Sequence, residues 1–170
     1  MPFTPIHMGP GLLVKAVLQG SFSLMVFGWA QILMDLQPLV VMIRGEGDVH
    51  GFSHTYVGAT LVGVIAALTG KHAGEFGLRV LRIPQFQPIR WAVAVVSAFI
   101  GTYSHVLLDS VMHFDMQPFA PFGRTNPLLH WISVDALHLF CLVSGAVGAV
   151  LYFAVSRWFI KRGKLESDPN

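Results

Sequence analysis

Cysteine and charge are scarce in this sequence, and each scarcity excludes a class of protein. The single cysteine, Cys141, lies in an apolar run, which excludes a disulfide framework and a thiolate metal site. Only 12% of the 170 residues are charged, whereas 54% are hydrophobic and the mean hydropathy is +0.61. This composition is too apolar for a water-soluble domain and is typical of a membrane protein. The net charge of +2 is too small to indicate nucleic-acid binding.

The chain also lacks internal repeats, low-complexity segments and a recognisable signal peptide. Its start has no basic region and no cleavage site, so we interpret it as mature sequence. We expect one integral-membrane metal-binding domain over residues 1–163 and a solvated C-terminal tail over residues 164–170.

Long apolar stretches are abundant by contrast. Residues 21–43, 91–112 and 134–160 are each long enough to cross a bilayer, which takes about 20 residues. Residues 56–69 form a shorter stretch that spans if His54 and its neighbours lie at the interface. We therefore predict an all-α polytopic membrane bundle of about four transmembrane helices plus a short N-terminal hairpin helix.

The hairpin follows from helix length. Residues 12–43 as one helix would be about 48 Å long, at about 1.5 Å per residue, against a hydrocarbon core of about 30 Å. Gly20 is a natural stop and restart, so the short helix over residues 11–19 should fold back on the first span. Folding back brings His7 and Asp35 to nearly the same depth.

Histidines and aspartates recur at spacings of four. His50 and His54 form one pair, and His105, Asp109 and His113 should lie on one helical face. An aspartate in lipid costs roughly 2.5–3.5 kcal/mol, so such residues are usually functional. Imidazoles and carboxylates that converge in an apolar setting are suited to a divalent metal.

A down-up-down course of the spans places these groups at one membrane face. We expect one to three divalent ions, with zinc as the metal, and we expect Asp35 and Asp109 to be catalytic. The alternatives are a structural hydrogen bond for His105 and Asp109 and a turn role for Asp35. The predicted ligands are His7, Asp35, His50, His54, His105 and Asp109.

Four further residues are candidates for a second metal subsite. His113 and Asp115 are equally consistent with a solvated loop, and Asp135 and His138 with an interhelical hydrogen bond.

Two arginines on the predicted site face, Arg44 and Arg124, are candidate phosphate-binding residues, although lone interfacial arginines often only contact headgroups. The proline-rich loop over residues 116–127 carries Phe119 and Phe122. It predicts either an apolar gate for a lipid-like substrate or simple burial.

Basic residues are distributed unevenly between the two predicted faces. Nine of the eleven lie opposite the site, and the positive-inside rule therefore predicts a site on the non-cytoplasmic side and a cytoplasmic C-terminus. The nine are Lys15, Lys71, Arg79, Arg82, Arg90, Arg157, Lys161, Arg162 and Lys164.

The order of these motifs, with the opening Met-Pro-Phe-Thr-Pro and the segment that follows Asp115, resembles a bacterial family of membrane-bound metal-dependent hydrolases. The resemblance extends to about Pro127. The same order of histidines and aspartates is distantly similar to the zinc phospholipase C and single-strand nuclease superfamily. The resemblance implies a bacterial inner-membrane protein with a clustered zinc site that hydrolyses phosphoesters. Relatives often have Asp-x-Asp where this chain has Asp35 and Gln37, and an arginine where it has Gly51.

We therefore predict a membrane-embedded hydrolase in which a metal-activated water attacks a phosphoester of a lipid or lipid-linked substrate. Membrane lipid is the expected partner, and the sequence does not indicate an oligomeric state. The alternatives are a small ion or proton transporter and a non-catalytic metal-binding membrane protein. A haem protein ranks last, because haem ligands normally lie at mid-membrane without adjacent carboxylates.

Overall fold

The computed structural model describes residues 5–167, with side chains described for residues 6–158. Within that range all regular secondary structure is helical, which confirms the predicted fold class. The α-helices are α1 (Met8–Leu18), α2 (Leu24–Met34), α3 (Leu36–Arg44), α4 (Tyr56–Val80), α5 (Trp91–Met112) and α6 (Val134–Ser167). The short 3-10 turns are η1 (Pro5–His7), η2 (Gln19–Ser21), η3 (Phe52–His54) and η4 (Pro84–Phe86).

Four segments are long and apolar enough to cross a membrane. They are α2 with α3, then α4, α5 and the described part of α6. The bounds of α5 agree with the expected residues 91–112, whereas α4 continues to Val80 rather than residue 69 because no proline interrupts it before Pro84. Likewise α6 continues to Ser167, past the expected residue 160, and residues 168–170 lie outside the described residues.

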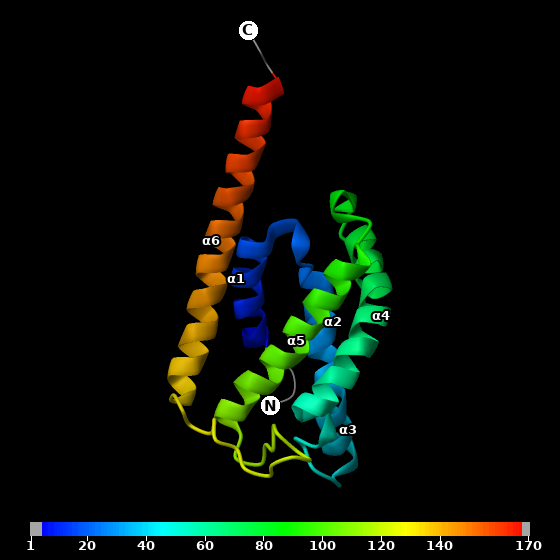
Figure 1. The fold of residues 1–170 in the computed structure, drawn as a ribbon, viewed down its shortest axis with the longest axis vertical. Helices are drawn as coiled ribbons and strands as arrows, with labels where there is room; N and C mark the ends of the chain where they lie inside the picture. The colour runs from blue at the N-terminus through cyan, green and yellow to red at the C-terminus, as the bar shows by residue number, and fades with distance from the viewer. Residues whose placement is uncertain (1–4, 168–170) are drawn as a thin grey trace.

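The helices form two packed units (Figure 1). In one, α1 lies along α6, and in the other α2, α4 and α5 pack against one another. Contacts between the units are sparse by comparison. The expected N-terminal hairpin is present, with α1 and α2 joined by a turn at the end of the molecule far from the long loops.

Glycines make the contact between α1 and α6 possible. A side chain at Gly9 would collide with the backbone carbonyl of Cys141, and one at Gly148 would collide with the backbone at Leu13. Small residues at such positions let two membrane helices approach closely. Because His7 directly precedes α1, this contact also determines where His7 lies.

Small residues play the same part in the second unit. Ala30, Ala66 and Ala98 are fully buried in the core shared by α2, α4 and α5. At Gly101 an added side chain would press on Ala30 and on the carbonyl of Phe27. The close approach of α2 and α5 places the end of α2 opposite the second half of α5.

The first span is broken at Asp35, which ends α2 and precedes α3. Pro38 explains the position of the break, since a proline has no N–H and its ring clashes with the carbonyl four residues earlier, here Met34. The helix resumes after the break and runs to Arg44.

Candidate metal centre

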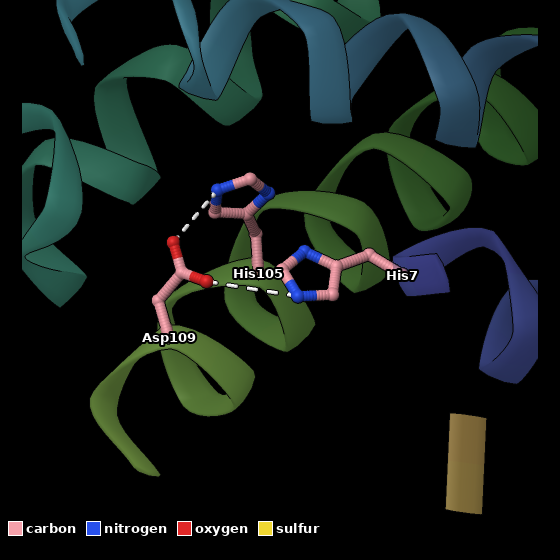
Figure 2. A group of neighbouring side chains, drawn as sticks. All are labelled: His7, His105 and Asp109. Atoms are coloured by element: carbon pink, nitrogen blue, oxygen red, sulfur yellow. Dashed lines mark ion pairs between the residues drawn. The ribbon is translucent and has the colours of Figure 1, made fainter. Parts of the chain in front are cut away.

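Three histidines surround the carboxylate of Asp109. His105 precedes Asp109 by one turn of α5, and its Nε2 lies 3.1 Å from Asp109 Oδ2. His54, in η3, places its Nε2 3.5 Å from the same oxygen. His7, in η1, approaches from the other helical unit, with its Nε2 3.6 Å from Asp109 Oδ1. Figure 2 shows how the two oxygens of Asp109 face His105 and His7 separately.

A second carboxylate joins this cluster. Asp35, at the break between α2 and α3, lies with Oδ1 3.4 Å from His105 Nε2. All five residues are at most 6% exposed, so the described residues largely exclude bulk water from them. The structure therefore brings together five of the six predicted ligands, His7, Asp35, His54, His105 and Asp109. The sixth, His50, lies beside His54, with ring centroids 5.2 Å apart.

The histidine nitrogens are arranged as metal ligands are. The Nε2 atoms of His7, His54 and His105 are buried, and none has a hydrogen-bond partner among the described residues. Leaving a buried polar atom unpaired is costly, which indicates that something else belongs between these groups. In a tetrahedral zinc site, with ligand distances of about 2.0–2.1 Å, neighbouring ligand atoms are about 3.3 Å apart. The nitrogen-to-oxygen distances of 3.1–3.6 Å bracket that value.

Three overlapping groups of side chains can each hold an ion. They are His7 with His105 and Asp109, Asp35 with His54 and His105, and His50 with Asp109 and His113. Asp109 belongs to two of the groups, and its two oxygens face different histidines, Oδ1 facing His7 and Oδ2 facing His54 and His105, so it would contribute to holding an ion in either group.

Gln31 orients His105, and sequence reasoning missed it. The Nδ1–H of His105 donates to Gln31 Oε1 at 2.6 Å, and Gln31 Nε2 donates to the carbonyl of Gly101 at 3.0 Å. Since Oε1 only accepts, His105 must carry its proton on Nδ1, which leaves the Nε2 lone pair free for a metal. A polar amide in an apolar span, four residues before Asp35, was the signal that could have identified it.

A similar set of contacts holds His54. The hydroxyl of Ser53 lies 2.9 Å from His54 Nδ1, and the backbone N–H of Ser53 donates to Gln37 Oε1 at 2.8 Å. Thr55 then caps α4 by accepting from the N–H of Gly58. Gln37 thereby helps to hold the turn that carries His54.

A more open subsite adjoins the buried one. His50 stacks on His113 with ring centroids 4.2 Å apart, and its Nδ1 lies 2.8 Å from the partly exposed Asp115. The sequence predicted that His113 lies on the same helical face as His105. This prediction is wrong, because α5 ends at Met112 and the backbone of His113 is extended. His113 still faces the cluster, in one group with Asp109.

Burial keeps His7, His54 and His113, which lie outside the spans, in their neutral form. Loss of hydration lowers the pKa of His7 to about 4, and it also lowers the pKa values of His54 and His113. Neutral imidazole is the form that binds a metal, so protons do not compete for these nitrogens at neutral pH.

The remaining predicted site residues lie apart from these groups. Asp135 and His138 are in the first turns of α6, and the structure brings neither into any of the three groups. The reason is that α6 packs on α1 and makes few contacts with α5. Arg44, at the end of α3, and Arg124, in the loop after α5, are both exposed.

Comparisons with known proteins do not extend the description. No protein-family model, no curated protein and no solved structure matches this chain.

The arrangement predicts that the purified protein retains a divalent metal. His54→Gln and Asp109→Asn should each remove most of it, and Gln31→Leu should weaken affinity by about 10–100-fold, as outer-shell substitutions typically do. Metal content is measured by atomic emission after gentle purification. His72→Ala is the control, because His72 is exposed and contacts Trp91 at the opposite end of α4. Full occupancy in both His54→Gln and Asp109→Asn would refute the site.

Proposed function

We propose that this protein is a membrane-embedded, zinc-dependent hydrolase that cleaves a phosphoester of a lipid or lipid-linked substrate. The observation that supports it most directly is the set of three buried imidazole nitrogens that make no hydrogen bond among the described residues and face two buried carboxylates at one end of the membrane spans. Membership of the metal-dependent hydrolase family that the motifs resemble is part of the proposal.

The position of each residue around the cluster suggests its role in the proposed reaction. Zinc bound here would polarise a phosphoryl oxygen and lower the pKa of a water molecule. Asp109 would ligate through both oxygens, as its placement between His7 and His54 allows. Asp35 would orient the attacking water and accept its proton. Arg44 or Arg124, both exposed, would offset the charge of the phosphate.

The cluster is buried at one end and exposed at the other, and this difference favours a hydrolase over a closed metal-binding site. His54 and His105 are 1% exposed, whereas the Asp115 carboxylate beside His50 is 38% exposed. The buried end is suited to holding an ion, and the open end to admitting water and a polar headgroup. No Ser-His-Asp arrangement is needed, because the metal supplies both the electrophile and the nucleophile.

A transporter fits the structure less well. Beyond the cluster, the buried polar side chains of α5 are the hydroxyls of Thr102 and Ser97, and the buried Glu75 of α4 is paired with Lys71, so the described residues do not provide a chain of free ionisable groups across the membrane. A haem is also disfavoured, because His105 lies with its ring centroid 5.2 Å from those of both His7 and His54, which leaves no room for a porphyrin.

The proposal places the protein in a bacterial inner membrane, with the cluster facing the non-cytoplasmic side. The α1–α2 turn, the α4–α5 connection and the C-terminal end of α6 share the end away from the cluster (Figure 1). These segments carry Lys15, Arg79, Arg82, Arg90 and Arg157, which supports a cytoplasmic position for that end.

Thiol labelling tests this orientation. In a Cys141→Ala background, Glu46→Cys in the exposed loop after α3 should react in intact cells with a membrane-impermeant maleimide. Gln85→Cys, exposed in the α4–α5 connection, should react only after the cells are opened. The reverse pattern would refute the orientation and place the chemistry in the cytoplasm.

Metal-dependent turnover tests the activity itself. The purified protein should hydrolyse a phosphoester in detergent, a chelator should abolish turnover, and added zinc should restore it. Asp35→Asn should lower turnover by about 100-fold or more, the usual range for loss of a general base, while thermal stability changes little.

His72→Ala should keep wild-type turnover, since His72 is far from the cluster. A metal-loaded protein that is inert towards phosphomonoesters, phosphodiesters and phospholipids would refute the hydrolase proposal and favour a metal-binding role without catalysis.

A further inference from the structure

A long apolar groove follows α2 from one end to the other. Its volume is about 650 Å³, and its lining comes mainly from α2 and the end of α4, with Met8 at its rim. The residues that matter here are Met25, Gly28, Trp29, Gln31, Asp35 and Phe76.

The two ends of the groove differ chemically. Asp35 and Gln31 line one end, and both belong to the metal centre, Asp35 directly and Gln31 through its hydrogen bond with His105. Met25 and Phe76 line the other end, which is apolar. A ligand that is complementary to this groove has a charged or polar head and a hydrocarbon chain.

The length of the groove agrees with such a ligand. Leu24 and Asp35 both line it and are eleven positions apart, which corresponds to about 16 Å along a helix. The hydrocarbon core of a bilayer is about 30 Å thick, so one leaflet accounts for about 15 Å. A chain about as long as one leaflet is thick can therefore lie along α2 with its head at Asp35.

We propose that this groove binds the hydrocarbon chain of a phosphate-bearing lipid that enters sideways from the bilayer, with its phosphate at the metal centre. The inference rests on the proposed function, and it names the substrate class as a long-chain amphiphile. Hydrophobic contact along α2 supplies binding, and the metal centre supplies recognition of the phosphate.

The loop over residues 116–127, for which the sequence predicts either a gate or simple burial, lines a different cavity from the α2 groove. A smaller cavity of about 260 Å³ is lined by Phe119 and Phe122 of that loop together with Tyr56 and Tyr103. None of the described residues of the metal centre lines it, whereas Asp35 lines the α2 groove. The α2 groove is therefore the route along which a chain reaches the site.

Photo-crosslinking tests the groove without relying on turnover. The probe is hexadecyl phosphate with a diazirine in the middle of its chain, added to the metal-loaded protein in detergent micelles. Adducts mapped by mass spectrometry should concentrate on Trp29, Ile32 and Phe76. Gly28→Phe should reduce them at least tenfold, because Gly28 faces the groove and an added Cβ makes only ordinary contacts with Met8. Leu142→Phe, on the exposed face of α6, is the matched control and should keep them.

A second readout separates this inference from the proposed function. Gly28→Phe should lose hydrolysis of hexadecyl phosphate while keeping its metal and its hydrolysis of ethyl phosphate. Groove-specific adducts on a wild-type protein that hydrolyses no phosphomonoester, phosphodiester or phospholipid would refute the hydrolase and support the chain site. Adducts spread equally over lipid-facing residues such as Leu61 and Leu142, and unchanged by Gly28→Phe, would overturn the chain site.

Discussion

The contact on which the structure depends is the meeting of three imidazoles at the Asp109 carboxylate. His54 and His105 approach it from the unit of α2, α4 and α5, and His7 approaches it from the unit of α1 and α6. The two units otherwise share few contacts, so the cluster is a principal link between them. Two buried carboxylates in such a place cost several kcal/mol unless they are compensated, and a bound cation compensates both at once. Binding of a metal would therefore be coupled to the assembly of the two units, as it is in other proteins whose ligands come from separate elements.

Contacts around the cluster hold the histidines in place and leave the cluster open on two sides. Gln31, Ser53 and Gln37 hold the histidines from the protein side, so the ligand geometry does not depend on the ion alone. His50, His113 and Asp115 open the cluster towards the loops, while the groove along α2 opens it towards the bilayer. In the proposed function, water would reach the cluster past Asp115, and a lipid chain would reach it along the groove that ends at Asp35. That combination is what the hydrolysis of a lipid phosphoester requires.

The sequence alone predicted the spans, the hairpin and most of the residues that meet in the cluster, because each rests on a local or additive property. Hydropathy over about 20 residues identifies spans, a spacing of four pairs His105 with Asp109, and chain length alone brings His7 back to the depth of Asp35. The partners that were missed depend on helix rotation, which an apolar helix does not reveal: Gln31 reaches His105 only because α2 presents that face to α5. The distance of Asp135 and His138 from the cluster depends in turn on the glycines that bind α6 to α1.

X-ray absorption at the zinc edge of the purified, zinc-loaded protein tests the central claim most directly, because it reports which atoms surround the ion. The account predicts nitrogen and oxygen ligands at about 2.0–2.1 Å, with the outer-shell scattering of at least two imidazoles and no sulfur at about 2.3 Å. The imidazole scattering should weaken in His54→Gln. A shell made only of oxygen, without imidazole, or a shell that is identical in His54→Gln, would contradict a metal held by these histidines around Asp109.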